Sequence, residues 1–375
     1  MRKRLLITLA FPPAIGGMQS HLFERCKGAL QDKIMVLAPY MEGSQEFDRR
    51  QRFKIYRWSN LGGETPGLRR ALQFLLPLSA AARIHQKEGF DALECGQALP
   101  FAIIALLFKR VRGIPYLIWT HGNDILRPQR YRLATGLLRL GLENADLVAA
   151  NSQETKGEVL RVAPGLKRVI IFTPGVDTQT FNPHLDGSSI RQRYLLEGKR
   201  VLLTVARLIE RKGVDRVIKC LPRLCDTIPE LIYVVVGNGP ERGRLERLAQ
   251  ELGVSERVVF AGRVRGEELP LFYAACDIFI MPSRSARERW DMEGYGLVFL
   301  EAGACGKPVI GGQGSGTEDA IEDGVTGLLI DPQDEDQIIE AILRILNDPP
   351  FARRLGENGR RKALQKPDWS LIEKL

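Results

Sequence analysis

The chain has 375 residues, a hydrophobic fraction of 44% and a formal net charge of +9. Its length predicts two domains of ordinary size, and no apolar run reaches the ~18 residues that a membrane-spanning helix needs. Six cysteines without metal-ligand spacing and only four histidines argue against a disulfide framework and a metal centre. We therefore expect a cytoplasmic protein without a metal or other cofactor.

The excess positive charge lies in the first half of the chain. Residues 1–180 hold 26 Lys and Arg against 15 Asp and Glu (26 − 15 = +11), and residues 181–375 hold 28 against 30 (28 − 30 = −2). This imbalance favours an anionic partner for the first half: a membrane surface, an acidic lipid or a phosphorylated substrate. Nucleic acid fits less well, because no binding motif and no interleaving of aromatic and basic residues appears.

Short apolar runs alternate with amphipathic stretches along the whole chain. We interpret the opening "MRKRLLITLAF" as a first buried strand rather than a signal peptide, because prolines and a Gly-Gly pair follow it. The strands predicted in the first half are 4–10, 33–39, 90–95, 114–120, 145–151 and 168–175, with a core helix over 99–108. Those predicted in the second half are 200–207, 230–237, 257–264, 276–283, 307–312 and 326–331.

Continuous Val, Ile and Leu runs separated by helices indicate parallel sheets covered on both faces. We expect an α/β protein with two Rossmann-like, doubly wound domains facing across a cleft, where the carboxyl ends of the strands bind ligands. The predicted domains are residues 1–180 and 181–357, with 177–194 as a linker. Residues 358–375 are expected to form a terminal helix that packs back toward the first domain, anchored by Trp369.

The stretch "WDMEGYGLVFLEAGACGKPVI" (residues 290–310) places one glutamate, Glu293, before a predicted apolar helix and another, Glu301, within it. Gly296 begins this helix, and the free N–H groups from about Leu297 onward suit a phosphate. A long ligand with hydroxyls at both ends and a charged centre, such as a sugar–diphosphate–ribose, would engage all of these groups. A solvated Glu301 is the plain alternative, but its apolar neighbours argue against it.

The same stretch is similar to the E-x7-E signature of glycosyltransferase family four, the retaining transferases of the GT-B fold. Further motifs follow in order: "GGMQSH" (16–21), "NS" (151–152), "PGVDTQTF" (174–181), "VARLIERKGVDRVI" (205–218), "VVGNGPERGRL" and "FAGRV". The chain most resembles bacterial phosphatidylinositol mannosyltransferases and related enzymes that use GDP-mannose.

The resemblance assigns the donor-binding residues. It gives Gly17 and the backbone at Gly296 and Leu297 the phosphates, Glu293 the hydroxyls of the transferred sugar, and Glu301 the ribose. Arg207 and Lys212 would neutralise the leaving diphosphate, and Val264 would lie beside the base. From the residues alone, Gly17 could belong to a plain tight turn and the two cations could be surface charges.

On the acceptor side, the resemblance points to Gln19 and His121. His121 ends a predicted first-domain strand, at the edge where ligands bind. A lone histidine is often structural, but the matching histidine of the family places His121 near the reacting sugar and the acceptor. Together with Glu293, it is our catalytic candidate.

Three other segments have competing interpretations. "DED" (334–336) imitates a metal-binding D-x-D motif, but it starts a helix, where acidic residues favour the dipole anyway. "VVVGNGPERG" lacks the spacing of a dinucleotide loop. The stretch 127–142 sets Arg127, Arg130, Arg132 and Arg139 beside four leucines, so it is either a helix lying on an anionic membrane or one with a solvated basic face.

The sequence therefore predicts a metal-independent retaining glycosyltransferase that moves a hexose, by resemblance mannose from GDP-mannose, to an acceptor hydroxyl on a lipid or glycan. A cytoplasmic location, peripheral on the inner face of the cytoplasmic membrane, fits the basic first half. The alternatives are a UDP-sugar-dependent transferase of the same family, a nucleotide-sugar epimerase, and a non-catalytic partner subunit with this fold.

Overall fold

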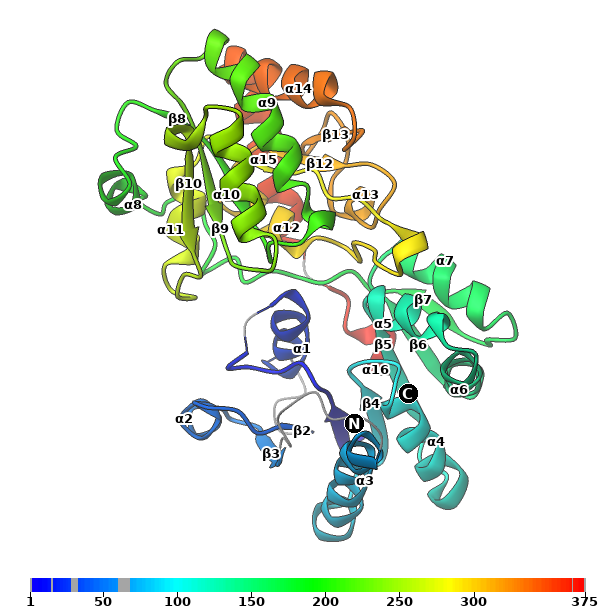
Figure 1. The fold of residues 1–375 in the computed structure, drawn as a ribbon. Helices are drawn as coiled ribbons and strands as arrows, with labels where there is room; N and C mark the ends of the chain where they lie inside the picture. Colours follow the sequence, from blue (N-terminus) through cyan, green and yellow to red (C-terminus); the bar gives the residue numbers. More distant parts are fainter. Residues whose placement is uncertain (1, 15, 28–32, 60–67, 366, 374–375) are drawn as a thin grey trace. The chain divides into compact units, whose positions relative to one another are not determined.

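The chain divides into two compact units in the computed structural model, which describes residues 2–14, 16–27, 33–59, 68–365 and 367–373 (Figure 1). Unit 1 comprises Met1–Pro174 together with Pro367–Leu375, and unit 2 comprises Gly175–Lys366. Our expected boundaries were residues 180 and 357. Helix α15 (Pro349–Ala363) runs through the second of these positions inside unit 2, so the segment that joins unit 1 is shorter than expected.

Unit 1 is built on a seven-stranded sheet of order β3-β2-β1-β4-β5-β6-β7, in which every pairing is parallel. Its strands are β1 (Arg4–Ile7), β2 (Ile34–Pro39), β3 (Lys54–Trp58), β4 (Ala92–Cys95), β5 (Tyr116–Thr120), β6 (Leu147–Ala150) and β7 (Val169–Ile171). Its helices are α1 (Gly17–Lys27), α2 (Ser44–Arg49), α3 (Leu68–Glu88), α4 (Phe101–Arg112), α5 (Asn123–Leu126), the 3-10 helix η1 (Arg127–Arg130), α6 (Arg132–Glu143), α7 (Gln153–Val162) and α16 (Ser370–Glu373).

Unit 2 repeats this architecture with a six-stranded parallel sheet of order β10-β9-β8-β11-β12-β13. Its strands are β8 (Arg200–Val205), β9 (Leu231–Val236), β10 (Val258–Gly262), β11 (Ile278–Met281), β12 (Val309–Gly312) and β13 (Leu328–Ile330). Besides α15, its helices are α8 (Ser188–Arg193), η2 (Glu210–Lys212), α9 (Val214–Thr227), α10 (Arg242–Glu251), η3 (Ser255–Arg257), α11 (Leu269–Ala275), η4 (Arg287–Arg289), α12 (Leu297–Ala304), α13 (Thr317–Ala320) and α14 (Glu335–Asn347).

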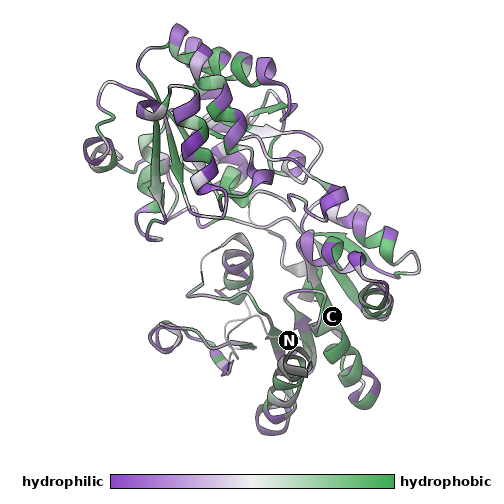
Figure 2. Ribbon diagram, in the orientation of Figure 1, coloured by the Kyte–Doolittle hydropathy of each residue, from purple (hydrophilic) through white to green (hydrophobic). Residues whose placement is uncertain are grey.

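Each sheet is covered on both faces, as the continuous apolar runs predicted. Strands β2 and β9 are almost wholly buried along their length, and the four central residues of β8 are buried. Each unit has one hydrophobic cluster on either side of its sheet. Figure 2 shows hydrophobic residues gathered in the strands and on the helix faces beside them. All twelve predicted strands are confirmed. Among the strands that the structure describes, β3, at the edge of the first sheet, is the one that the sequence did not predict.

The stretch predicted as a linker packs on unit 2. The ring of Phe181 lies edge-on to the ring of Tyr273, with 5.7 Å between centroids. The Arg360 guanidinium of α15 donates to the carbonyl oxygens of Thr178 and Phe181, at 3.3 and 2.9 Å from Nη1. These contacts explain why unit 2 starts at Gly175, before the polar stretch rather than within it.

A buried group of charges lies at the centre of unit 1. Glu94 of β4 is fully buried, and its carboxylate accepts from Arg25 of α1 at 2.8 Å and from Arg4 of β1 at 3.2 Å. The Trp119 indole also donates to it, at 3.0 Å. Burial acts to raise the pKa of Glu94, but Arg25 and Arg4 outweigh burial and hold the pKa below its ordinary value.

The same arginines hold the end of the chain. Arg4 donates from Nη2 to the carbonyl oxygen of Ile372 at 3.0 Å, and the Arg25 guanidinium lies over the Trp369 ring at 5.2 Å. Trp369 also packs on Phe172, with 4.7 Å between ring centroids. The predicted anchoring role of Trp369 is therefore confirmed, and its partners belong to unit 1.

Replacing Glu94 by alanine should destabilise unit 1 by about 3–5 kcal/mol, because it leaves two buried guanidinium groups without their carboxylate partner. Urea unfolding followed by tryptophan fluorescence measures this, since Trp58, Trp119 and Trp369 all lie in unit 1. Glu46→Ala is the control: it breaks an exposed ion pair with Arg50 and should change stability by less than about 0.5 kcal/mol. Equal effects of the two substitutions would contradict this account.

Candidate active site

The predicted donor-binding residues of unit 2 follow the carboxyl ends of three strands. Arg207 follows β8, Val264 follows β10, and Glu293 and Gly296 lie in the segment that follows β11. Because all the strands of this sheet are parallel, their carboxyl ends meet at one edge. This is the edge at which open α/β sheets bind their ligands.

Glu293 is the centre of a buried ionic cluster. Its Oε2 accepts from Lys212 Nζ at 2.5 Å and from Arg211 Nη1 at 2.6 Å, and Arg211 also contacts Asp291 at 3.1 Å. Burial acts to raise the pKa of Glu293, but the charges of Lys212 and Arg211 outweigh it and lower the pKa. For Lys212, burial lowers the pKa, and the charge of Glu293 opposes this effect. Glu293 is therefore ionised at neutral pH.

Arg207 does not join this cluster. Its side chain is exposed, and it makes no ion pair among the described residues. The sequence predicted that Arg207 and Lys212 act together. In the structure, Lys212 contacts Glu293, and Arg207 stands at the carboxyl end of β8 with its guanidinium free to meet an anion.

Glu301, the second glutamate of the motif, has a different environment. It is 9% exposed, lies on α12 and accepts a hydrogen bond at Oε2 from the Tyr273 hydroxyl, 2.7 Å away. Burial raises its pKa to about 7, and the Tyr273 bond only partly offsets this effect. The sequence correctly predicted that Glu301 is not a solvated residue.

The predicted helix start is confirmed at Gly296. This glycine has φ +85°, and a Cβ there would lie 2.6 Å from the Phe299 ring, so a larger residue fits neither the backbone nor the space. Helix α12 then runs from Leu297. The N–H group of Phe299 donates to the carbonyl oxygen of Gly296 at 2.9 Å, whereas those of Leu297 and Val298 have no partner within the helix. They point out of the positive end of the helix, which favours an anion.

In unit 1, Gly17 and His121 lie beyond the carboxyl ends of β1 and β5, which belong to one parallel sheet. Gly17 is the first residue of α1 and is exposed. Gln19 is on the same helix, half-buried, and its Oε1 lies close above Gly16, 2.5 Å from where a Cβ would stand. Gly16 is therefore required for this conformation of the Gln19 side chain.

His121 is held by its hydrogen bonds. Its Nε2 lies 3.0 Å from the carbonyl oxygen of Gly96, and its backbone N–H donates to Asp124 at 2.8 Å. A carbonyl oxygen only accepts, so Nε2 carries the proton, and in the neutral ring Nδ1 is an acceptor. Burial lowers the pKa of His121, which keeps the ring neutral at pH 7. His21 of α1 packs edge-on against it, with 5.8 Å between ring centroids.

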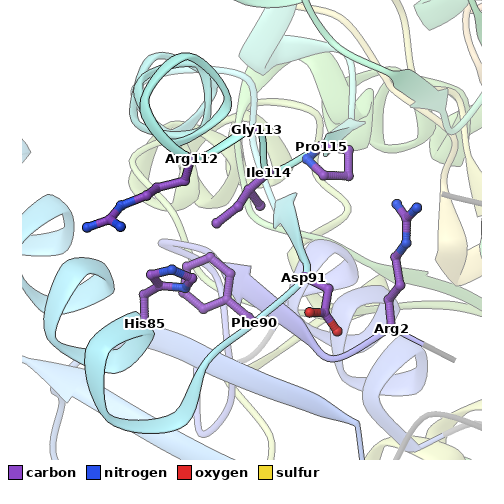
Figure 3. Close-up of a pocket in the computed structure, with 8 residues that line it drawn as sticks. All are labelled: Arg2, His85, Phe90, Asp91, Arg112, Gly113, Ile114 and Pro115. Carbon is purple, nitrogen blue, oxygen red and sulfur yellow. The ribbon is translucent and has the colours of Figure 1, made fainter.

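A separate pocket of about 590 Å³ lies on unit 1 (Figure 3). Its lining residues Arg2, Asp91 and Pro115 precede β1, β4 and β5, so it lies at the amino ends of these strands. His121 lies at the opposite edge of the same sheet. None of the predicted site residues lines this pocket.

Sequence reasoning missed three residues of these sites: Arg211, Tyr273 and His21. Arg211 adjoins Lys212 in a charged stretch that resembles a solvated surface, and its proximity to Glu293 comes from a contact 82 residues apart in the chain. Tyr273 is 28 residues from Glu301. Of these three residues, only His21 could have been found from the sequence, since it ends the glycine motif "GGMQSH".

The acidic stretch 334–336 has a structural role. The Asp334 side chain accepts from the backbone N–H groups of Asp336 and Gln337, at 2.9 and 3.2 Å, and so caps α14. Among the described residues, no group of three or more His, Cys, Asp or Glu side chains is arranged to hold a metal ion. No described helix combines the length and apolar character needed to span a bilayer.

Comparison with known proteins identifies the family. Residues 15–180 match the profile described as Glycosyltransferase Family 4, and residues 187–362 match Glycosyl transferases group 1. A GDP-mannose-dependent alpha-(1-6)-phosphatidylinositol monomannoside mannosyltransferase from Mycolicibacterium smegmatis is 34% identical over 97% of this chain and 94% of its own length. A GDP-mannose-dependent monoacylated alpha-(1-6)-phosphatidylinositol monomannoside mannosyltransferase from Corynebacterium glutamicum is 30% identical over 99% of this chain and 96% of its own length. The chain belongs to the glycosyltransferase family that these profiles and relatives represent, and it is a hexosyltransferase.

Solved structures establish the fold. Anabaena HepE in complex with UDP-glucose superposes with a TM-score of 0.81 at 21% identity, covering 100% of this chain and 98% of its own. Sucrose-phosphate synthase from Thermosynechococcus elongatus superposes with a TM-score of 0.80 at 24% identity, and the match covers 98% of this chain and 96% of the synthase chain. The fold is GT-B, with two Rossmann-like domains, as the motifs predicted.

The two glutamates of the motif should respond oppositely to substitution by glutamine. Because the pKa of Glu301 rises from 4.5 to about 7 on folding, its ionisation removes about 3 kcal/mol of stability as pH rises from 4.5 to 7. Glu301→Gln should therefore be more stable than the unsubstituted protein at pH 8, and similar to it at pH 5.

Glu293→Gln is the matched control. The pKa of Glu293 is lowered on folding, so its charge stabilises the protein above pH 4.5 and loses this effect in acid. This variant should have a lower Tm at pH 8. Thermal melts of the two variants at both pH values test the assignment, which fails if Glu301→Gln also lowers Tm at pH 8.

Proposed function

We propose that this protein transfers mannose from GDP-mannose, with retention of configuration, to a hydroxyl of a phosphatidylinositol-type glycolipid. The observation that carries the proposal is the Glu293 cluster: a buried, ionised carboxylate held by Lys212 and Arg211 at the ligand-binding edge of the unit 2 sheet. The activities named for the Mycolicibacterium and Corynebacterium relatives supply the donor and the class of acceptor.

Unit 2 would bind the donor along this edge. The diphosphate meets Arg207, Lys212 and the N–H groups at the start of α12, and the sugar hydroxyls donate to Glu293. These positive groups stabilise the negative charge that develops on the leaving diphosphate, the role that a metal ion has in other transferases. We therefore propose a metal-independent reaction. Glu301 accepts from the ribose, and Val264 lies beside the base.

Lys212 must serve two anions. In the structure Lys212 Nζ donates to Glu293 at 2.5 Å, and a diphosphate near the start of α12 would compete for the same ammonium. Arg211 keeps its own 2.6 Å contact with Glu293. Arg211 therefore keeps Glu293 ionised and in place when Lys212 turns toward the phosphates, so that the carboxylate remains available to the sugar.

Unit 1 would supply the acceptor side, with Gln19 and His121, and a further phosphate contact from the backbone at Gly17. The neutral ring of His121 presents Nδ1 as an acceptor, which suits a sugar hydroxyl or the attacking hydroxyl. No buried carboxylate is assigned as a nucleophile. Retention would then arise from attack on the same face of the sugar from which the diphosphate leaves.

Glu293→Ala should reduce mannose transfer from GDP-mannose by at least about 100-fold, because it removes the acceptor for the sugar hydroxyls. Radiolabelled transfer to phosphatidylinositol mannosides measures this, with UDP-glucose as a second donor and NMR of the product for anomeric configuration. Glu210→Ala is the control, since Glu210 is exposed and pairs with Arg289. Unchanged turnover in Glu293→Ala contradicts the assignment, and epimerised donor formed without acceptor favours an epimerase.

We also propose that unit 1 reaches its lipid acceptor by binding the inner face of the cytoplasmic membrane through α6. Leu133, Leu137 and Leu140 recur at helical spacing and are 78%, 39% and 40% exposed. Tyr131, just before the helix, is 62% exposed. The exposed basic side chains around them are Arg127, Arg130, Arg132 and Arg139. Apolar side chains flanked by arginines suit an anionic lipid surface.

Replacing both Leu133 and Leu137 by serine should reduce binding to anionic vesicles by about tenfold or more, because each leucine inserted in the bilayer contributes about 1–2 kcal/mol. Co-sedimentation with phosphatidylglycerol-containing and pure phosphatidylcholine vesicles measures this. Val325→Ser, which changes a 39% exposed residue of unit 2, is the control. Equal binding to neutral and anionic vesicles, or no binding to either, rules out this surface.

A further inference from the structure

Tyr273 and Glu301 form an isolated hydrogen-bonded pair inside unit 2. The Tyr273 hydroxyl lies 2.7 Å from Glu301 Oε2, and both side chains come from helices, α11 and α12, that pack against each other. Tyr273 is fully buried and Glu301 is 9% exposed. The other carboxylate oxygen, Oε1, accepts no hydrogen bond from the part of the chain that the structure describes.

The position of the tyrosine hydroxyl is fixed by packing. The Tyr273 ring lies between Phe181 and Phe279, with centroid distances of 5.7 and 5.6 Å. Burial, and then the neighbouring Glu301, hold the pKa of Tyr273 well above its ordinary value, so the hydroxyl keeps its proton and donates. A rigid donor on one oxygen leaves the other oxygen of Glu301 free to accept and gives the carboxyl group a defined orientation.

The nearby cations are occupied elsewhere. Lys307 donates to the carbonyl oxygens of Ala274 and Cys276, both at 2.9 Å. Arg360, from α15, donates to the carbonyl oxygen of Ala304 at 3.0 Å and to the carbonyl oxygens of the 175–181 segment. A further titratable neighbour is the Cys305 thiol at the C-cap of α12, whose pKa burial raises to about 12. Among the residues that the structure describes, Glu301 therefore has no charge partner, in contrast to Glu293.

We propose that Tyr273 is a positioning residue for the donor nucleotide: it aims the free oxygen of Glu301 at the ribose hydroxyls, and nucleotide binding expels a proton from this carboxyl group. The proposal rests on the proposed function, in which Glu301 accepts from the ribose. Glu301 and the ribose form and break no covalent bond, and the proton passes to the solvent.

The direction of the proton linkage follows from the hydrogen bonds. In the free protein, burial raises the pKa of Glu301 to about 7, so this carboxyl is about half protonated at neutral pH. Two ribose hydroxyls donate more strongly to an ionised carboxylate than to a neutral acid, so the bound nucleotide lowers this pKa. Affinity for the ribose should therefore rise as pH increases through about 7 and level off above it.

The test compares GDP with 2′,3′-dideoxy-GDP, which lacks both ribose hydroxyls, by calorimetry between pH 6 and 8.5, on the full-length protein. The ratio of affinities cancels the titration of the phosphates, which both nucleotides share. With a carboxyl pKa of about 7, the ionised fraction rises about tenfold between pH 6 and 8, so the preference for GDP should rise about tenfold over this range.

Three variants separate positioning from simple stability. Tyr273→Phe keeps the ring packing but removes the donor, so the preference for GDP should fall by about tenfold at pH 7 and its rise should move to higher pH. Glu301→Gln should give a preference that does not change with pH. Tyr233→Phe is the control: Tyr233 is also fully buried in unit 2, but its hydroxyl bonds Thr204, so this variant should keep the unsubstituted pH profile.

A GDP preference that stays flat from pH 6 to 8 in the unsubstituted protein overturns the proton linkage, and an unchanged profile in Tyr273→Phe overturns the positioning role. Thermal melts of each variant show whether it is folded. Failure of the proposed function gives a different result, since the unsubstituted protein would then bind GDP at no pH and would not turn over GDP-mannose.

Discussion

A carboxylate removed from water must find compensating charges or hydrogen bonds. The candidate site depends on how two carboxylates, Glu293 and Glu301, meet this requirement eight positions apart in the chain. Glu293 meets it with two cations, which keep it ionised. Glu301 meets it with one tyrosine hydroxyl, which only partly offsets the burial that raises its pKa to about 7. Environments that drive the pKa values of two carboxyls apart are a common way of giving them separate roles.

The parallel sheet of unit 2 makes this arrangement possible. Arg207, Lys212 and Glu293 come from segments after two neighbouring strands, β8 and β11, so residues about 80 positions apart reach one edge of the sheet. Gly296 then turns the chain into α12, which directs its free N–H groups outward and carries Glu301 into the interior. The groups that we propose to bind phosphate and both carboxylates are thus placed by one strand–loop–helix connection and its neighbour.

Most of this could be predicted because its signals are local. Continuous apolar runs revealed twelve strands, and the apolar neighbours of Glu301 revealed its burial. Strand β3 was missed because it is an edge strand whose residues are mostly half-buried, so its apolar run is interrupted. Arg211 and Tyr273 were missed because their partners are distant in the chain and neither residue stands out from its own neighbours.

Unit 2 is, in chain order, an insertion within unit 1. The last residues belong to unit 1, where Ile372 is buried and Trp369 packs on Phe172 and over Arg25. Residues 175–366 can therefore be excised as one continuous fragment, whereas unit 1 is discontinuous. A protein shortened by nine residues would lack part of the core beneath α1, the helix that carries the glycine motif, although the deletion starts more than three hundred residues away from it.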